Sequence, residues 1–464
     1  MEYSVELTGG NVMTKKRMYL NAFEMNCAGF QSHALWRHPE DNTPGYKSID
    51  YWTHLAKLLE KGRFDAVFLA DVLGVYDVYQ GSRDPAIVNG VQVPANDPAF
   101  VIPIMASVTK HLGFGLTAST THEHPYTFAR KISTLDHLTN GRIGWNVVTS
   151  YLNSAAKNIG LAQQTGHDER YARAEEYMEV VYKLWETSWE DDAVVVNKEK
   201  GIYTDPSKVH DIDHDGKYFS VPGNHLCEPS PQRTPVIFQA GASSSGRKFA
   251  ANHAELVFIS STSAEKTKNI VATFRQEFAQ SGRPADDVKV IAAITPITAP
   301  TTEEAQAKYE DYKRYISRDG AFSLVGGWTG VDLSKVDPDE KVEYIQNDAM
   351  RSILKGFAGM TPNEIADEVA LGGLGPVIVG DPHQIADELE YWMDYADVDG
   401  FNIVYSITPG SFEDFVELVV PVLQERGLVR KEYEEGTFRN NLFGNDQLPN
   451  SHPAKKVGRV NITS

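Results

Sequence analysis

Cysteine is scarce in this sequence. Its 464 residues include only Cys27 and Cys227, which are too few for a disulfide framework. No run approaches the roughly 20 uninterrupted apolar residues that a membrane-spanning helix needs. The polar N-terminal segment also lacks the apolar stretch of a secretory signal. We therefore expect a cytoplasmic protein that does not cross a membrane.

Basic residues are also few. Lys and Arg total 44 against 63 Asp and Glu, which gives a net charge of −19 at pH 7 with His neutral. Such a surface repels nucleic-acid phosphates and anionic lipid headgroups. The rest of the composition, 41% apolar and 10% aromatic, is that of an ordinary globular protein. Binding to nucleic acid or to a membrane surface is therefore disfavoured.

Short β-rich runs alternate with patterns of helical periodicity from residue 16 onward. The eight predicted strands are 17–24, 65–71, 112–120, 142–149, 235–240, 255–260, 288–297 and 399–405. The predicted helices are 48–61, 125–138, 170–187, 263–281, 301–317, 382–397 and 411–426. Eight strands with crossover helices predict the α/β class and a closed (β/α)8 TIM barrel.

The chain is about 200 residues longer than a typical barrel of ~250 residues. Three segments account for most of the excess: 76–97, 188–233 with a hairpin-like stretch near 216–222, and 318–375. We expect these insertions to lie on loops, where they shape a substrate cavity or make oligomer contacts. The expected organisation is a polar tail over 1–15, one barrel domain over 16–427, and a C-terminal extension over 428–464 that wraps the surface or a partner subunit.

A doubly wound dinucleotide-binding domain is the alternative α/β architecture. It needs G-x-G-x-x-G in the first turn between a strand and a helix. The nearest match begins at Gly113 and lies within a predicted strand, so this alternative is disfavoured.

Chemistry in a parallel barrel gathers where the strands end. The predicted strand ends carry amides, hydroxyls and small residues, at positions 25–27, 71, 119–122, 146, 149–150, 239–243 and 260–262. This set suits a polar planar ligand better than hydrolysis by two carboxylates. Asp71 closes an apolar run, so its carboxyl group needs a hydrogen-bond donor from the protein or from a ligand.

The Gly/Ser-rich segment 241–247 follows one predicted strand and opens a helix over 247–253. Backbone N–H groups at such a helix start, with Arg247 nearby, can bind one phosphate, although the segment can also be a plain loop. The segment 167–171 allows two readings. Asp168 caps a helix, or Tyr171 lies against a bound ligand.

His122 and His124 form an H-x-H pair at a strand end, a spacing that can hold a metal. The later strands end in Gln, Ala and Ser and supply no further ligands, so no metal site is expected. Cys27 at the end of the first strand is either a reactive thiol or a small buried apolar group.

Several longer motifs carry a resemblance. They are 20–27 (LNAFEMNC), 36–39 (WRHP), 62–71 (GRFDAVFLAD), 133–137 (STLDH), 140–150 (NGRIGWNVVTS), 167–171 (HDERY), 230–243 (SPQRTPVIFQAGAS) and 409–415 (PGSFEDF). Over roughly residues 17–445 the sequence resembles the bacterial-luciferase-like flavin monooxygenases, in the branch that contains the nitrilotriacetate, dibenzothiophene sulfone, long-chain alkane and dimethyl sulfide monooxygenases. The segments 70–79 (ADVLGVYDVY) and 326–330 (GGWTG) point most closely to the dimethyl sulfide and long-chain alkane enzymes.

The resemblance implies a two-component monooxygenase. A separate NAD(P)H-dependent flavin reductase supplies FMNH2, which activates O2 as a flavin C4a-(hydro)peroxide that oxygenates a small organic substrate. The implied FMN contacts, matched position by position, are Asp71, Asn146, Ser150, Tyr171, Ala240, Gly241, Ala242 and Ser243. The resemblance implies a homodimer or homotetramer that works with a flavin reductase as a functional, transient partner.

The implied catalytic residues are Cys27, Tyr76, Gln92 and Tyr151. Two positions depart from the alkane enzyme, because Phe30 and Tyr151 each stand where that enzyme has His. Tyr151 instead matches the dimethyl sulfide branch, although Phe30 departs from that branch too. A dry pocket is needed to protect the oxygenating species, and Phe30, Tyr76, Tyr79 and Trp328 are candidates for its aromatic wall.

The leading hypothesis is therefore oxygenation of a small apolar organosulfur molecule such as dimethyl sulfide. The alternatives are a long-chain alkane or sulfone monooxygenase of the same family, an oxidoreductase that transfers hydride with a flavin or deazaflavin, and a flavin-binding barrel without oxygenation chemistry.

Overall fold

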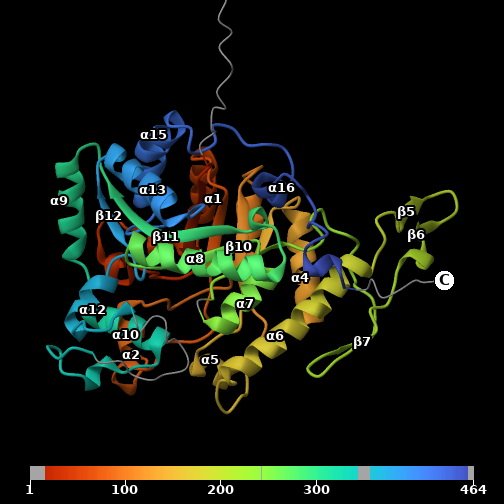
Figure 1. The fold of residues 1–464 in the computed structure, drawn as a ribbon, viewed down its shortest axis with the longest axis horizontal. Helices are drawn as coiled ribbons and strands as arrows, with labels where there is room; N and C mark the ends of the chain where they lie inside the picture. The colour runs from red at the N-terminus through yellow and green to blue at the C-terminus, as the bar shows by residue number, and fades with distance from the viewer. Residues whose placement is uncertain (1–15, 242, 343–355, 458–464) are drawn as a thin grey trace, which may run out of the picture.

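The computed structural model describes residues 16–241, 243–342 and 356–457, so the predicted tail 1–15 lies outside the described residues. Eight parallel strands form a closed ring in the order β1-β2-β3-β4-β9-β10-β11-β13, and β13 pairs back to β1 (Figure 1). The strands are β1 (Tyr19–Met25), β2 (Ala66–Ala70), β3 (Gly113–Ser119), β4 (Ile143–Val148), β9 (Val236–Gln239), β10 (Leu256–Ile259), β11 (Lys289–Thr298) and β13 (Gly400–Val404). The predicted (β/α)8 barrel is confirmed, and all eight predicted strands coincide with barrel strands.

Helices surround this ring. They are α1 (Ile49–Lys61), α3 (Ile102–Ala106), α4 (Pro125–Leu138), α6 (His167–Tyr182), α7 (Ser244–His253), α8 (Ala264–Ser281), α9 (Thr302–Lys313), α13 (Pro382–Ala396), α14 (Gly410–Asp414) and α15 (Val420–Glu425). Their starts follow from local chemistry: Ser48 Oγ accepts from Asp50 N at 3.1 Å to begin α1, and Asp381 with Gln384 forms a capping box on α13. The helix predicted over 301–317 ends earlier, at Lys313.

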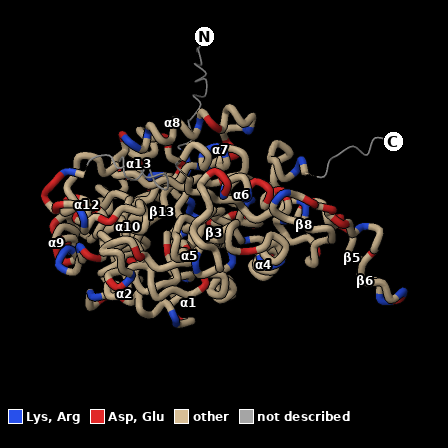
Figure 2. Tube along the Cα trace, turned by 90° about the horizontal axis from the view of Figure 1, so that it is seen from below, with Lys and Arg blue, Asp and Glu red and all other residues tan. Residues whose placement is uncertain are grey.

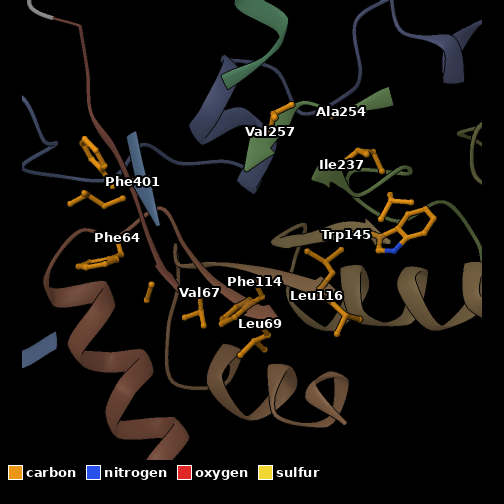
Figure 3. Close-up of a cluster of buried hydrophobic side chains, with 14 of the residues drawn as sticks. Phe64, Val67, Leu69, Phe114, Leu116, Trp145, Ile237, Ala254, Val257 and Phe401 are labelled. Carbon is orange, nitrogen blue, oxygen red and sulfur yellow. The ribbon is translucent and has the colours of Figure 1, made fainter. Parts of the chain in front are cut away.

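The outer face of the barrel carries the main core. Alternate strand residues such as Val67, Leu69, Phe114 and Leu116 are buried under the helices (Figure 3). This alternation is the period of two expected of strands. Each predicted strand therefore buries one face on the helices and the other inside the barrel.

Aromatic rings fill the inside of the barrel. Phe68, Phe238 and Phe258 contact one another, with ring centroids 4.4 to 6.2 Å apart. Gly115 and Gly144 leave the space for Phe238, because a Cβ atom there would lie 2.3 Å and 2.7 Å from its ring. Two glycines on neighbouring strands thus admit one large ring to the barrel interior.

The C-terminal extension closes the amino-terminal end of its own barrel. Helix α16 (Phe438–Phe443) places Phe438 over Gly113, where a Cβ atom would lie 2.6 Å from the ring. Phe438 and Leu442 belong to the same buried cluster as the rings inside the barrel. At least this part of the extension, which was expected to wrap the surface or a partner subunit, lies against the chain's own strands.

Two of the three inserted segments lie at the opposite end. Their helices α2 (Asp84–Asn89), α10 (Arg318–Thr329) and α12 (Pro362–Val369) gather there with α5 (Asn153–Asn158), away from α16 (Figure 1). Two hairpins occupy 188–233: β5 (Val194–Asn197) with β6 (Ile202–Thr204), and β7 (His214–Asp215) with β8 (Ser220–Val221). The second is the predicted hairpin; the first was not predicted, and it projects from the body in Figures 1 and 2.

One further strand was missed. β12 (Val377–Gly380) pairs with the carboxyl-terminal half of β11, outside the closed ring. Its apolar run 377–379 is visible in the sequence but was not assigned to a strand. Within the described ranges, no helix combines the length and hydrophobicity required to span a bilayer.

Candidate active site

The carboxyl ends of the barrel strands face α2, α5 and α10, the end at which parallel barrels carry their reactive side chains. Two groups of sequence-predicted residues lie at this end. One is a hydrogen-bonded tyrosine cluster, and the other is a set of small and polar residues on β3, β4 and the start of α7.

Tyr76 is the centre of the first group. Its Oη donates to Gln92 Oε1 at 2.9 Å and lies 3.0 Å from Tyr151 Oη. Since Tyr76 donates to Gln92, the bond between the two hydroxyls is donated by Tyr151. Burial raises the pKa of Tyr76 well above its ordinary value and that of Tyr151 to about 12, so both phenols stay protonated at neutral pH.

The backbone around Cys27 pairs with the segment that carries Gln92. Cys27 pairs with Ala95 across an antiparallel bridge, and Gln92 N donates to Gly29 O at 2.8 Å. The Cys27 thiol itself donates to Gly29 O at 3.3 Å. Burial, with the Glu24 carboxyl nearby, raises the pKa of this thiol. The environment therefore favours a neutral buried thiol over a reactive thiolate.

Apolar side chains surround the Tyr76 ring. The buried wall comprises Ala86, Val91, Leu152, Ala155, Leu324 and Trp328. Gly327 of α10 packs directly on Tyr76, because a Cβ atom there would lie 1.9 Å from the ring. Such a wall limits the access of water to the two phenols.

Two of the expected aromatic wall residues lie elsewhere. Phe30 packs edge-on against Phe23, with ring centroids 4.8 Å apart, and belongs to the main core. Tyr79 donates its hydroxyl to Asp319 Oδ1 at 3.0 Å. Only Tyr76 and Trp328 of the four candidates belong to the buried cluster around Tyr76.

Backbone strain links this cluster to the second group. Ser150 adopts φ of 59° and Gln92 φ of 52°, the left-handed region that non-glycine residues seldom occupy. Ser150 Oγ donates to Ser119 Oγ at 2.8 Å, while the next residue, Tyr151, contacts Tyr76. The turn at Ser150 therefore sends adjacent side chains to different parts of the site, and such strain is concentrated at functional sites.

Unpaired polar atoms mark the second group. Asn146 Nδ2 donates to Thr117 Oγ1 at 3.0 Å, which leaves Asn146 Oδ1 buried with no hydrogen-bond partner among the described residues. Both ring nitrogens of His122 are in the same condition. Burial lowers the pKa of His122, so its ring is neutral and offers one donor and one acceptor. Buried groups of this kind require a ligand or water.

Asp71 directly follows β2, close to the predicted strand end. Burial and the Asp97 carboxyl raise its pKa to about 7. At neutral pH this carboxyl group therefore holds a proton part of the time and can donate or accept a hydrogen bond. In the described part of the chain, no hydrogen bond joins the Asp71 carboxyl group to the other predicted cofactor contacts.

The start of α7 forms a tight cradle. Ser243 caps the helix by accepting from Gly246 N at 3.0 Å, and Gly241 N donates to Gln239 Oε1 at 2.8 Å. A Cβ atom on Gly246 would lie 2.8 Å from Tyr171 Oη and 3.0 Å from Gly241 Cα. The predicted residues Tyr171, Gly241 and Ser243 thus meet here, with Ala240 at the end of β9, while Ala242 lies outside the described residues.

Two expectations about helix starts change. α6 is capped by Gly166 and begins at His167, so Asp168 lies in the first turn and is not the cap. α7 begins at Ser244 and not at Arg247, because the Ser243 side chain supplies the cap.

The sequence reasoning did not assign His167 to the site. Its Nε2 lies 3.2 Å from Ser243 Oγ, and its ring centroid lies 5.0 Å from that of Tyr171. The motif 167–171, one of those that carry the family resemblance, contains both rings. It could therefore have indicated His167 as well, but only Tyr171 was assigned to the site.

The expected flavin fits this arrangement. Asn146 Oδ1 and the His122 ring offer unpaired polar atoms to a planar heterocycle, and the α7 start offers backbone N–H groups to a phosphate. Ser150 and Tyr151 are adjacent in the chain, and they connect the polar group on β3 and β4 to the apolar wall around Tyr76. The site can therefore hold a planar polar cofactor beside an apolar cluster that contains two phenols.

The H-x-H pair does not form a metal centre with other ligands in the described ranges. There, no three His, Cys, Asp or Glu side chains are grouped as metal ligands. His124 Nδ1 instead accepts from Tyr126 N at 3.3 Å and caps α4.

Comparisons with known proteins give one consistent result. A family profile described as "Luciferase-like monooxygenase" matches residues 29–398. The chain is 52% identical over 448 residues to dimethyl-sulfide monooxygenase from Hyphomicrobium sulfonivorans, which covers 95% of this chain and 93% of that protein. The crystal structure of DmoA from the same organism matches with a TM-score of 0.90, over 95% of this chain and 96% of that one.

Two other relatives are similarly complete. Long-chain alkane monooxygenase from Geobacillus thermodenitrificans is 53% identical over 452 residues, covering 97% of this chain and 99% of that protein. The crystal structure of riboflavin lyase with modified FMN and substrate riboflavin is 39% identical, with a TM-score of 0.90 over 95% of this chain and 99% of that one.

Proposed function

Because this chain belongs to the luciferase-like monooxygenase family, we propose that it uses reduced FMN, supplied by a separate NAD(P)H-dependent reductase, to oxygenate a small apolar organosulfur compound such as dimethyl sulfide. The broader activity follows from the family: the chain is a flavin-dependent monooxygenase that uses O2 and a small organic substrate. The particular flavin, the reductase and the substrate belong to the proposal.

Support for FMN comes from the two ends of the cofactor site. The polar atoms of Asn146, Ser150 and Asp71 would contact the planar ring, and Tyr171, Ala240, Gly241 and Ser243 would surround the phosphate. A related crystal structure contains modified FMN. When bound and reduced, the flavin supplies the electrons that let one oxygen atom of O2 reach the substrate while the other leaves as water.

The protein side chains orient and protect this chemistry. Tyr76 and Tyr151 are both protonated; Gln92 accepts the hydrogen bond of Tyr76, and Tyr76 accepts that of Tyr151. When the Tyr151 hydroxyl turns from Tyr76 toward the reacting oxygen, it can stabilise negative charge as it develops there. The wall around Tyr76 limits water, which would divert reduced oxygen to H2O2.

The substrate assignment rests on Tyr151 and on the character of the residues around Tyr76. The wall is apolar, and its polar atoms are phenols, which suits a small neutral molecule better than a polyanion. Tyr151 follows the dimethyl sulfide branch in place of the His of the alkane enzyme. The alkane reading stays as the second candidate, because the relative of that name is 53% identical and Cys27, Tyr76 and Gln92 all match its pattern.

The single observation that carries the proposal is the Tyr151–Tyr76–Gln92 hydrogen-bonded cluster inside an apolar wall. Its test is product analysis by mass spectrometry with FMN, NADH, a flavin reductase and 18O2. Dimethyl sulfide, a long-chain alkane and dibenzothiophene sulfone would be offered separately. We expect 18O in products from dimethyl sulfide alone; labelled alcohol from the alkane would replace the organosulfur assignment by the alkane one.

The same assay tests the phenol cluster. Tyr151→Phe should lower the ratio of oxygenated product to H2O2 by about tenfold or more, because one hydrogen-bond donor is lost without much change in shape. Tyr203→Phe is the matched control, since Tyr203 is 65% exposed on β6. An unchanged ratio in Tyr151→Phe would remove this residue from the catalytic assignment.

We also propose that the protein acts in the cytoplasm as a homodimer or homotetramer. Only two cysteines, no disulfide framework and the inserted segments outside the barrel support this. Sedimentation equilibrium of the purified chain would give the oligomeric state.

A further inference from the structure

A cavity of about 250 Å³ lies at the amino-terminal end of the barrel. It opens between α16 and the residues that precede and begin β10 and β11, among them Glu255, Arg283 and Lys289. Figure 1 shows α16 at the end of the molecule opposite to α2, α5 and α10, so this cavity is separate from the candidate active site. Nothing in the monooxygenase chemistry uses it.

Arg439, on one wall of this cavity, forms a bidentate ion pair with a carboxylate. It is 1% exposed, and its Nε and Nη2 donate to the two oxygens of Glu255 at 2.7 Å and 3.0 Å. These two nitrogens form one edge of the planar guanidinium, the edge that binds a carboxylate or phosphate through two parallel hydrogen bonds. Glu255 is neutralised by this pair and also accepts from Ile237 N at 3.0 Å.

Arg283 presents the same edge without an acceptor. It is 6% exposed, and its Nη1 donates to the carbonyls of Ala251 and Ala254 at 3.2 Å and 2.7 Å, at the end of α7. Its Nε and Nη2 are buried and have no hydrogen-bond partner among the described residues. An unpaired buried guanidinium edge is costly, so the fold leaves two strong donors beside a cavity that has room for a ligand.

Lys289 adds a second cation to the same wall. Within the described ranges, no ion pair or hydrogen bond is formed by its Nζ, which lies 5.8 Å and 5.6 Å from the ring centroids of Tyr19 and Phe443. Among the described residues the wall carboxylates form no salt bridge with the two cations, although Glu255 and Asp287 attract Arg283 and Asp286 attracts Lys289. Asp287 accepts from Ser451 Oγ at 2.9 Å, and Asp286 is exposed at the rim.

We propose that this cavity binds a small oxyanion, a carboxylate or phosphate group held by the Nε and Nη2 edge of Arg283 with Lys289 as the second cation. The side-chain amides of Asn445 and Gln447 line the same space and can donate to further oxygens of the ligand. The bound anion would join α16 to the end of α7 through Arg283, and thereby stabilise the base of the barrel. The ligand is thus a structural or regulatory anion and not a substrate of the oxygenation.

The test is thermal unfolding of the flavin-free full chain in Tris chloride, with inorganic phosphate and malonate titrated separately. Each ligand should raise Tm in a saturable way, because binding to the folded state alone stabilises it. Arg283→Gln and Lys289→Gln should each weaken the apparent affinity by about tenfold or more, since a charge-assisted partner is lost. If Arg283→Gln fails to fold, Lys289→Gln still tests the proposal by itself.

One control variant locates the effect. Lys198→Gln removes one exposed positive charge from the tip of the β5–β6 hairpin and should keep the wild-type response. The proposal is overturned if neither anion raises Tm at millimolar concentration, or if both cavity variants respond like wild type.

Discussion

At the scale of single residues, burial decides which groups carry protons. The phenols of Tyr76 and Tyr151 are held protonated by burial, while the neutral His122 ring and Asn146 Oδ1 remain without partners in the described structure. Donors fixed by packing and acceptors left open are the arrangement that a cofactor can complete. A surface position could not impose either condition, because water would satisfy the same atoms.

Glu24 is the most strongly buried carboxyl group near the site. Tyr51 Oη donates to its Oε1, and burial raises its pKa from 4.5 to about 8 in spite of that hydrogen bond. The folded state therefore binds the Glu24 proton more tightly than the unfolded state does. The resulting stabilisation is complete below about pH 4.5 and is lost as the pH rises through about 8.

Glu24→Gln should remove this pH dependence. Between pH 5 and pH 8 the free energy of unfolding of the wild type should fall relative to that of the variant, by at most about 1.4 kcal/mol per pH unit. Urea denaturation at several pH values measures the difference. Glu434→Gln, at an exposed position, is the control and should run parallel to wild type. A parallel curve for Glu24→Gln would show that Glu24 is ionised in the folded protein.

At the scale of elements, the start of α7 and the packing of α10 determine the shape of the site. Glycine is required where the two elements approach their neighbours most closely, at Gly246 beside Gly241 and at Gly327 beside Tyr76. The strained turn at Ser150 then places the polar ring-binding side and the phenol side of the site within one β4–α5 connection. Helix starts and glycine contacts, and not strand residues alone, thus form the cofactor cradle.

Gly246→Ala should weaken FMN binding. The added Cβ atom would lie 3.0 Å from Gly241 Cα and 2.8 Å from Tyr171 Oη, so the cradle must open. We expect the dissociation constant for FMN to rise about tenfold, equivalent to ~1.4 kcal/mol, while Tm changes little because alanine favours the helix. Flavin fluorescence quenching gives the constant.

Gly223→Ala is the matched control for this prediction, because a Cβ atom there meets nothing within 4 Å. Equal FMN affinity in the two variants would mean that the α7 start does not bind the phosphate.

At the scale of the whole molecule, the barrel separates two ends with different tasks. Inserted helices cover the carboxyl ends of the strands, and α16 closes the opposite end. Acidic and basic residues are interspersed over the trace in Figure 2, so the net charge of −19 does not by itself create the anion sites. Local helix starts and buried arginines do so instead.

Phe438→Ala should destabilise the entire barrel. Phe438 is 1% exposed, and its ring centroid lies 6.0 Å from that of Phe238 inside the barrel. Loss of this ring should lower the free energy of unfolding by about 3 to 5 kcal/mol. Urea denaturation measures it, with Phe100→Ala, at a side chain 76% exposed, as the control. A loss below about 1 kcal/mol would show that the extension does not stabilise the barrel.

The barrel could be predicted because each of its strands has a recognisable pattern in the local sequence. Runs such as 65–71 and 142–149 are apolar, bounded and regularly separated by helical periodicity, and these properties survive without tertiary contacts. β12 and the β5–β6 hairpin were missed because they lie outside the closed ring, so the eight-strand barrel pattern does not call for them. Strand-end positions such as Asp71 and Asn146 also follow from topology, since parallel strands end together.

The remaining features depend on contacts between distant segments. Local patterns cannot show that Tyr76, Gln92 and Tyr151 share hydrogen bonds, or that His167 contacts Ser243, because these partners lie 16 to 76 residues apart. They also cannot show that one edge of the Arg283 guanidinium has no hydrogen-bond partner among the described residues. The sequence alone determined the eight-strand barrel, the acidic surface and the family resemblance, since composition and periodicity are local properties. Only the tertiary structure decided which polar groups are buried, paired or left open, because desolvation depends on everything packed around an atom.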